Sequence, residues 1–335
     1  MMTVADASPR STVGRPGPRP HVPGTARTVL RVHRAALVVW AGLVVVLCGW
    51  LVWATESAGR DARAAAEVCD RAGPDLCSTS IVWVGHSVTV GWIGLLTSYL
   101  FLAVAAYTGG ALIGRELESG TARFAWTQGV SPTRWLAAKL AVPALVVTVG
   151  ATALVLVYRW AWSAEQEPQY HGWMSDDAYL SRGPATVAYA LCALAVGAVT
   201  ALLIRRALPA LAVSVVATGL LGYAVAQVRA SFWPAVTVTT GQNGELALPT
   251  SAWEVENGAL VHGHQVPSLP VTQCYGGSTA HTRGCFDDLG VTGFYTTYHP
   301  ESHYWPLHLV ETGVVLAVTA AVTAAAFWLL RRRTA

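Results

Sequence analysis

The residues most capable of chemistry are histidines and aspartates in the last third of the chain. His299 and His303 have the i,i+4 spacing of zinc ligands on a helix, although Pro300 between them argues against a helix there. The other members of the group are His262, His264, Asp287, Asp288 and His308. We favour surface histidines on a folded loop and predict neither a catalytic residue nor a metal site.

Nucleotide chemistry requires motifs that the sequence lacks. A P-loop needs a lysine after a glycine-rich turn, and the only lysine is Lys139, which Leu140 follows. The zinc-protease pattern H-E-x-x-H and the nucleophile elbow G-x-S-x-G do not occur either. We therefore expect no cofactor on this chain and no enzymatic activity of its own.

A second group of reactive side chains lies in the segment 114–139, GRELESGTARFAWTQGVSPTRWLAAK. It mixes charged residues with Phe124, Trp126 and Trp135. This combination is typical of a short amphipathic helix that docks onto another protein at a membrane face. The alternative is that the aromatic side chains rest in the lipid interface.

The elements that must position these residues are apolar blocks. The sequence is 53% hydrophobic and 12% charged, whereas soluble domains carry about 25% charged residues. Blocks of about 20 apolar residues match the thickness of a hydrocarbon core. We predict an all-α membrane protein with six transmembrane helices, near 35–54, 88–113, 140–158, 185–204, 208–228 and 307–330. A cleaved signal peptide would have a shorter apolar region than the first block has.

Charge places both termini in the cytoplasm. With the amino terminus inside, 15 of the 22 basic residues fall in inner segments, while 16 of the 19 acidic residues fall in outer segments or, for Glu311, near the outer end of a span. This is the asymmetry that the positive-inside rule describes. The inner basic residues are Arg10, Arg15, Arg19, Arg27, Arg31, Arg34, Arg115, Arg123, Arg134, Lys139, Arg205, Arg206, Arg331, Arg332 and Arg333.

Domain boundaries follow from the spans. Residues 1–34 form a basic cytoplasmic segment, with 1–24 disordered and 25–34 either an interfacial helix or a plain flanking anchor. The six-helix membrane domain covers 35–330, and 331–335 form a cytoplasmic tail. Its extracellular loops are 55–87, 159–184 and 229–305, and its cytoplasmic loop is 114–139.

Cysteine placement agrees with this orientation. Cys69 and Cys77 share the first outer loop, and Cys274 and Cys285 share the third. An oxidising compartment permits a disulfide within each pair. Pairing across the loops and four free thiols are the alternatives.

Two further features concern the spans themselves. Glu311 is a possible intramembrane polar residue, although four residues into a helix is only about 6 Å of rise, close to the headgroups. Gly110 and Gly114 form a G-x-x-x-G pattern, which lets two helix backbones approach closely.

The segment 114–139 resembles the loop after the second helix in permease subunits of actinobacterial ABC exporters of the type-2 permease class. In that family R-E-x-E-x-G-T, A-W-T-Q and R-W-x-x-x-K-L recur. The matching residues here are Arg115, Glu116, Glu118, Gly120, Thr121, Ala125, Trp126, Thr127, Gln128, Arg134, Trp135, Lys139 and Leu140. A looser similarity runs through residues 182–215.

The resemblance implies a multi-pass permease subunit of an ABC exporter in the plasma membrane. Its expected partners are a separate ABC ATPase subunit, which binds ATP and magnesium, a second permease copy, and membrane lipid, with no nucleic acid. The coupling residues would be Arg115, Glu116, Glu118, Gly120, Thr121, Trp126, Gln128, Arg134 and Lys139. The alternatives are a membrane-embedded enzyme and a ligand-binding membrane anchor, each using the extracellular loop 229–305.

Overall fold

The computed structural model describes residues 31, 33–72, 80–164, 172–242, 248–249, 251–267, 274 and 278–334. The predicted basic segment 1–34 therefore lies almost entirely outside the described residues. Cys77 also lies outside them, and with it the predicted bridge to Cys69.

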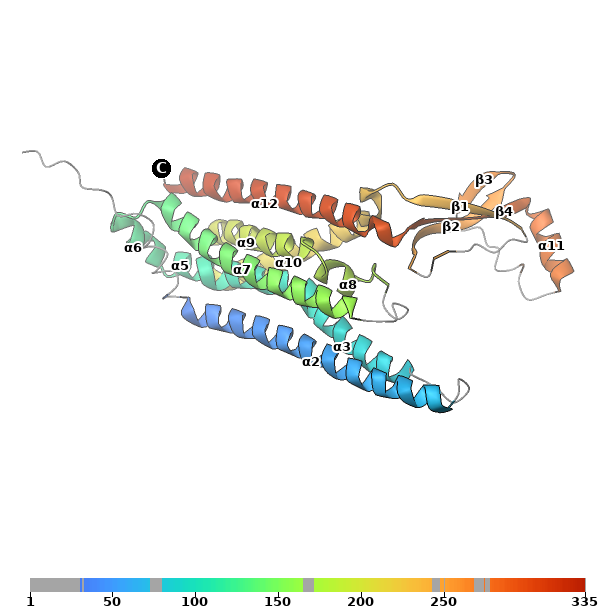
Figure 1. The fold of residues 1–335 in the computed structure, drawn as a ribbon. Coiled ribbons are helices and arrows are strands. Elements are labelled where there is room, and N and C mark those ends of the chain that lie inside the picture. The colour runs from blue at the N-terminus through green and yellow to red at the C-terminus, as the bar shows by residue number, and fades with distance from the viewer. Residues whose placement is uncertain are drawn as a thin grey trace, which may run out of the picture.

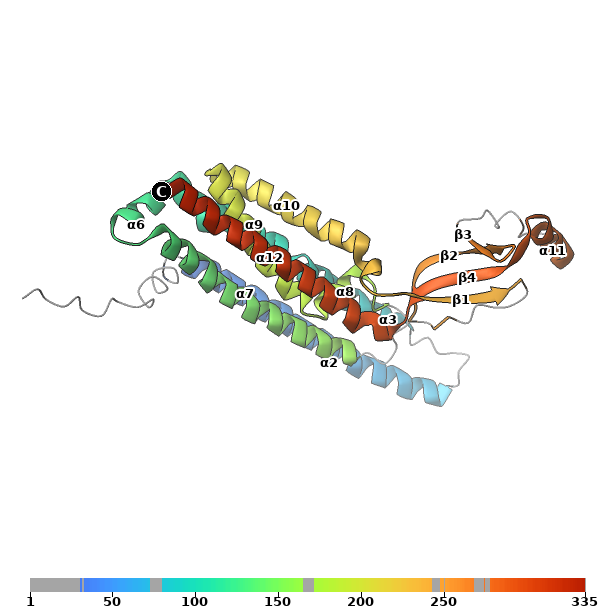
Figure 2. The ribbon, with the colours of Figure 1, turned by 90° about the horizontal axis from the view of Figure 1, so that it is seen from above.

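The described part of the chain contains six helices that are long and apolar enough to cross a membrane. They lie side by side in one elongated bundle (Figures 1 and 2). The predicted six-helix membrane fold is confirmed. Their ranges are Arg34–Ala65, Val88–Glu118, Pro132–Ser163, Ala185–Ile204, Ala207–Phe232 and Glu301–Thr334.

The first helix is longer than its apolar block. Helix α2 covers Arg34–Ala72, and α3 begins the next segment at Ser80–Ser98. Much of the predicted loop 55–87 is therefore helical. The sequence after Ala54 is rich in alanine and contains no proline up to Ala72, which favours continuation of the helix. Glu67 and Arg71 add an exposed i,i+4 pair, 3.6 Å apart.

The second span is built in four consecutive pieces. After α3 come α4 (Leu100–Tyr107), the π-helix η2 (Thr108–Gly114) and α5 (Arg115–Glu118). π-Helical turns are rare and are frequent near functional sites. Here the π-helix directly precedes the charged motif, so the predicted span to Ile113 continues through Glu118 as one helical rod.

Helix α9 forms the centre of the bundle and packs against α4, η2, α7, α10 and α12 (Figure 2). The ranges are Pro132–Ser163 for α7, Ala185–Ile204 for α9, Ala207–Val228 for α10 and Tyr304–Thr334 for α12. Most of the buried side chains of α9 are small, alanine above all. Small residues allow helix backbones to approach closely, which is how helices pack in a membrane.

One close approach between helices is at Gly197 of α9. A Cβ atom on Gly197 would lie 2.7 Å from the Cβ of Thr108 and 2.9 Å from the backbone nitrogen of Gly109. We expect Gly197→Ala to lower the free energy of unfolding by about 1–3 kcal/mol, as overpacking does. Thermal denaturation in detergent measures this change.

A matched control is Gly313→Ala on α12, where a Cβ would meet no atom within 4 Å. That substitution should be neutral or stabilising, because alanine is the better helix former. Equal effects of the two substitutions would contradict the packing argument.

The segment between the fifth and sixth spans folds as a small sheet at one end of the bundle (Figure 1). Its antiparallel strands have the order β1-β4-β2-β3. The ranges are Val236–Gly241 for β1, Trp253–Val261 for β2, His264–Pro267 for β3 and Val291–His299 for β4. The predicted loop 229–305 is thus a folded unit. The sequence indicated a folded loop but did not predict the sheet.

Local chemistry explains two features of this unit. His262 and Gly263, the two residues between β2 and β3, both have positive φ, at 50° and 81°. A two-residue hairpin turn requires such angles.

Helix α11 (Thr279–Asp288) carries Cys285, which forms a disulfide with Cys274 across a Cα–Cα distance of 5.6 Å. Phe286 and Val291 pack beside Cys274 in a small core.

Candidate functional site

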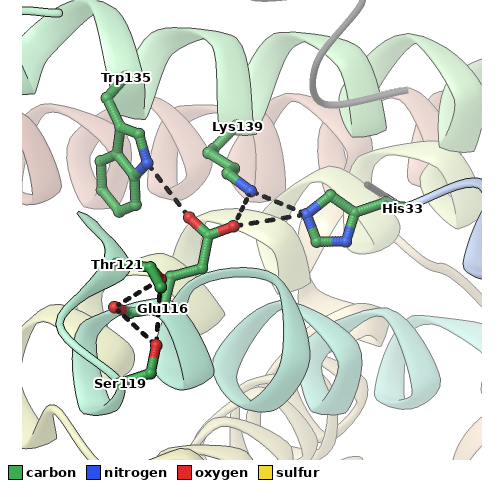
Figure 3. Close-up of polar contacts among 6 residues, drawn as sticks. All are labelled: His33, Glu116, Ser119, Thr121, Trp135 and Lys139. Atoms are coloured by element: carbon green, nitrogen blue, oxygen red, sulfur yellow. Dashed lines mark hydrogen bonds and ion pairs between the residues drawn. The ribbon is translucent and has the colours of Figure 1, made fainter. Parts of the chain in front are cut away.

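The acidic motif of the second span occupies α5, at the end of the bundle away from the sheet (Figure 1). Glu116 lies within contact distance of the start of α7 (Figure 3). Its Oε1 accepts a hydrogen bond from Lys139 Nζ at 2.5 Å, and its Oε2 accepts one from Trp135 Nε1 at 3.2 Å. One carboxylate therefore joins the second span to the third.

The Lys139 ammonium is buried, with 5% of its side chain exposed, whereas Glu116 has 22% exposed. A buried ammonium group needs a paired anion, because desolvation otherwise disfavours the charged form. Glu116 supplies that anion. Breaking this pair would leave an uncompensated charge inside the bundle.

His33, the residue just before the first span, completes the cluster. Its Nε2 lies 2.8 Å from Lys139 Nζ and 3.9 Å from Glu116 Oε1. Burial, followed by the Lys139 ammonium, lowers the pKa of His33, although the Glu116 carboxylate acts in the opposite direction. The neutral ring can then accept the hydrogen bond from Lys139. The cluster of Glu116, Trp135, Lys139 and His33, named here the Glu116 cluster, ties three spans together (Figure 3).

Glu118 reaches a fourth element. Its Oε2 accepts a hydrogen bond from the backbone N–H of Ala207 at 2.9 Å, at the first residue of α10. An acidic side chain is favourable there, because the first N–H groups of a helix lack internal partners and the helix dipole is positive at that end. The two glutamates of the motif thus hold different spans.

A tight turn follows the motif. Gly120 has φ 74°, a left-handed conformation that glycine adopts without steric cost. Thr121 Oγ1 donates to the Glu116 carbonyl at 3.3 Å and lies 3.0 Å from Ser119 Oγ (Figure 3). The turn sends the chain into α6 (Thr121–Thr127), which lies across the end of the bundle.

Helix α6 is held to the cluster by one aromatic contact. The Trp126 and Trp135 rings meet edge to face, with centroids 5.7 Å apart. Phe124, on the same helix, is 66% exposed. The structure leaves Arg115, Gln128 and Arg134 exposed and outside the Glu116 cluster. Of the predicted coupling residues, Glu116 and Lys139 belong to the Glu116 cluster. Gly120, Thr121 and Trp126 lie in the turn and helix that follow it, and Glu118 lies next to it on α5.

Helices extend into the predicted cytoplasmic loop 114–139 from both ends. Residues 115–118 complete the second helix, and α7 begins at Pro132. Ser131 caps α7 by accepting from Arg134 N at 3.4 Å, and proline is well suited to the first helical position. Lys139 and Trp135 therefore stand on a rigid helix and not in a loop.

A second polar cluster lies near the sheet end of the bundle. Glu311 of α12 is 0% exposed and pairs with Arg229, which is 5% exposed, through an Nε–Oε2 distance of 2.9 Å. Tyr189 of α9 donates to Glu311 Oε1 at 2.8 Å. Glu311 is thus enclosed by protein.

The surroundings of this ion pair are aromatic. Arg229 belongs to the 3₁₀ turn η3 (Arg229–Phe232), and its guanidinium lies 4.2 Å from the Tyr179 ring centroid. Tyr179 lies on α8 (Asp176–Ser181), within the predicted loop 159–184. His308 Nε2 accepts from the Ala185 N–H at 3.0 Å, so this histidine faces the bundle.

The outer histidines do not assemble into a metal site among the described residues. His299 Nδ1 lies 3.0 Å from His303 Nδ1, and His299 Nε2 lies 3.0 Å from the Ala230 carbonyl oxygen. The Trp253 ring packs on His299 at 5.3 Å. These contacts connect the base of the sheet to the 3₁₀ turn that carries Arg229.

Sequence reasoning missed His33, Arg229 and Tyr189. Nothing in the spacing of His33 relates it to the acidic motif. Arg229 had a usable signal, because it follows the fifth span directly and so lies at a depth similar to that of Glu311.

Comparison with known proteins gives one family. Residues 41–229 match the family described as ABC-2 membrane transporter related. No curated protein and no solved structure matches the chain. The matched range covers more than half of the chain and contains both glutamates of α5, Lys139 and Arg229. With six helices suited to spanning a membrane, the chain is a multi-pass membrane protein that belongs to the ABC-2 membrane transporter related family.

Proposed function

We propose that the chain is the permease subunit of an ATP-driven ABC exporter and that it couples to a separate ATPase subunit through α5 and α6. Members of its family are typically transport subunits without catalysis of their own. The observation that carries the proposal is the Glu116 cluster, which connects α5 to both α7 and the start of the first span.

The coupling follows from rigid contacts. A push on α6 reaches α7 through the Trp126–Trp135 contact, and a push on α5 reaches α10 through the hydrogen bond from Ala207 to Glu118. The largely buried Lys139–Glu116 ion pair fixes α5 against α7, so displacement of this end tilts several spans together. ATP hydrolysis by the partner would thereby drive alternation between inward- and outward-facing states.

Orientation supports the same assignment. The acidic motif, the Arg205–Arg206 turn and the arginines that end α12 lie at one end of the bundle, and the sheet lies at the other (Figure 1). Basic residues favour the cytoplasmic side. We therefore assign α5 and α6 to the cytoplasm, the sheet with its disulfide to the outside, and the protein to the plasma membrane.

The exposed apolar surface of the bundle indicates the remaining partners. Side chains of α2, α10 and α12 expose large apolar surfaces, among them Val38, Leu220 and Val314. Lipid and a second permease copy would cover these surfaces. ATP and magnesium would be held by the ATPase subunit, so we assign no cofactor to this chain.

Purification of the full-length tagged chain in mild detergent tests the proposal. Mass spectrometry of the accompanying proteins should identify a subunit with a P-loop. The variant Phe124→Asp should lose that subunit, because Phe124 is the most exposed aromatic side chain of α6. Val255→Asp, which changes an exposed apolar residue of the sheet, is the matched control and should retain it. Absence of any P-loop protein, or its equal retention by both variants, would overturn the proposal.

A further inference from the structure

Three arginines from separate elements line one small pocket at the end of the bundle that carries α6. Arg123 comes from α6, Arg205 from the turn after α9, and Arg333 from the last turn of α12. The pocket encloses about 80 Å³, and Leu202 and Leu330 form part of its wall. Guanidinium groups around a small cavity are suited to a phosphate, which accepts several N–H groups at once.

The positive charge of this pocket is not neutralised by the neighbouring acids. Among the described residues, Arg123, Arg205 and Arg333 form no ion pair with a carboxylate. The two glutamates of α5 are engaged elsewhere, with Lys139 and with the Ala207 N–H. Arg333 Nη1 donates to the Leu202 carbonyl, which holds this arginine against the end of α9.

Trp126 contributes an unused donor. Its side chain lines the same pocket, and its indole N–H is buried without an acceptor in the part of the chain that the structure describes. Buried donors are rarely left unpaired in proteins. The neighbouring Trp135 shows the usual arrangement, since its N–H donates to Glu116. An anion in the pocket would bring acceptor oxygens next to Trp126.

The backbone conformation of Arg205 is a third, independent observation that supports a binding role for this pocket. Arg205 has φ 57°, in the left-handed region that favours glycine, at the end of α9 where glycine is the common residue. An arginine there carries a conformational cost. Such cost is typical of positions where the side chain has a function. Here that side chain lines the pocket.

We propose that this pocket binds the phosphate headgroup of an anionic lipid from the adjacent leaflet. The pocket lies where α9, α12 and the second span end, and Leu202 and Leu330 give it an apolar wall. Basic pockets between helices on the cytoplasmic side are suited to anionic headgroups. The site needs no ATPase subunit, so lipid binding can be tested independently of the transport proposal.

Native mass spectrometry of the purified full-length chain, titrated with phosphatidylglycerol or phosphatidylcholine, tests this site. We expect preferential binding of phosphatidylglycerol. Arg205→Gly should weaken it about fivefold, the effect of one cation near a membrane surface. The same variant should melt at an equal or higher temperature, because glycine relieves the backbone cost. Arg123→Ala should weaken binding similarly.

Two neighbouring arginines are matched controls. Arg206 is exposed beside Arg205, and Arg332 lies 4.3 Å over the Trp328 ring, and neither lines the pocket. Arg206→Ala and Arg332→Ala should leave phosphatidylglycerol binding unchanged. Equal losses in these controls would show a diffuse basic surface and overturn the site.

Two more outcomes would also overturn the proposal. Displacement of the lipid by millimolar inorganic phosphate would assign the pocket to a soluble anion. Loss of the ATPase subunit from Arg205→Gly, with lipid binding unchanged, would assign it to the protein partner.

Discussion

Glu311→Ala is expected to lower the free energy of unfolding by about 3–5 kcal/mol, the effect of removing the carboxylate from a buried ion pair. Arg229 is 5% exposed and lies over the Tyr179 ring, so the substitution removes the carboxylate that faces a buried guanidinium group. Tyr189 also loses its acceptor. Thermal or denaturant unfolding of the protein in detergent measures the change.

The matched control is Glu301→Ala, which removes an exposed carboxylate near the same end of the last span. Its effect should stay within about 0.5 kcal/mol. The double variant Glu311→Leu with Arg229→Met should recover most of the lost stability, because apolar replacement of a whole buried pair is often neutral. A double variant as unstable as Glu311→Ala would show that the ion pair is not the cause.

Glu116→Gln is expected to reduce permease-dependent stimulation of the ATPase about tenfold. The substitution leaves Lys139 buried without its anion. A hydrogen bond to a charged group contributes about 1.5–3 kcal/mol, and 1.4 kcal/mol corresponds to a factor of ten. Turnover by the reconstituted complex, compared with that of the ATPase alone, measures coupling without knowledge of the cargo.

Further variants, measured in the same assay, test whether the effect is specific to the Glu116 cluster. Arg134→Ala alters an exposed cation on α7 that precedes Trp135 but does not contact Glu116, and it should leave stimulation unchanged. The exchange Glu116→Lys with Lys139→Glu should restore a substantial part of the stimulation. If Arg134→Ala were as harmful as Glu116→Gln, or if the exchange restored nothing, the Glu116 cluster would not be the coupling element.

The membrane architecture was accessible from the sequence because it depends on local properties. A run of about 20 apolar residues is sufficient to predict a span. Arg205 and Arg206 already marked a short turn, which the structure shows between α9 and α10. The extension of α2 to Ala72 was not accessible, because helix propensity in a polar segment is only a weak indicator.

The candidate site was accessible in part. The recurrent motif identified Glu116, Glu118 and Lys139 as important residues. It did not reveal that Lys139 would be helical, or that His33, 106 positions earlier, would contact it. Long-range contacts depend on how helices rotate and pack against one another, and no local pattern specifies that rotation.

The sequence by itself therefore determined that this protein has six helices suited to crossing a membrane and a basic end, because partition into lipid depends on the residues of each segment alone. It also identified the charged motif. Only the tertiary structure decided that Glu116 joins the start of the first span to the third, that Glu118 caps α10 and that Arg229 neutralises Glu311. A buried charge must find its partner wherever packing places one, and packing is a property of the whole bundle.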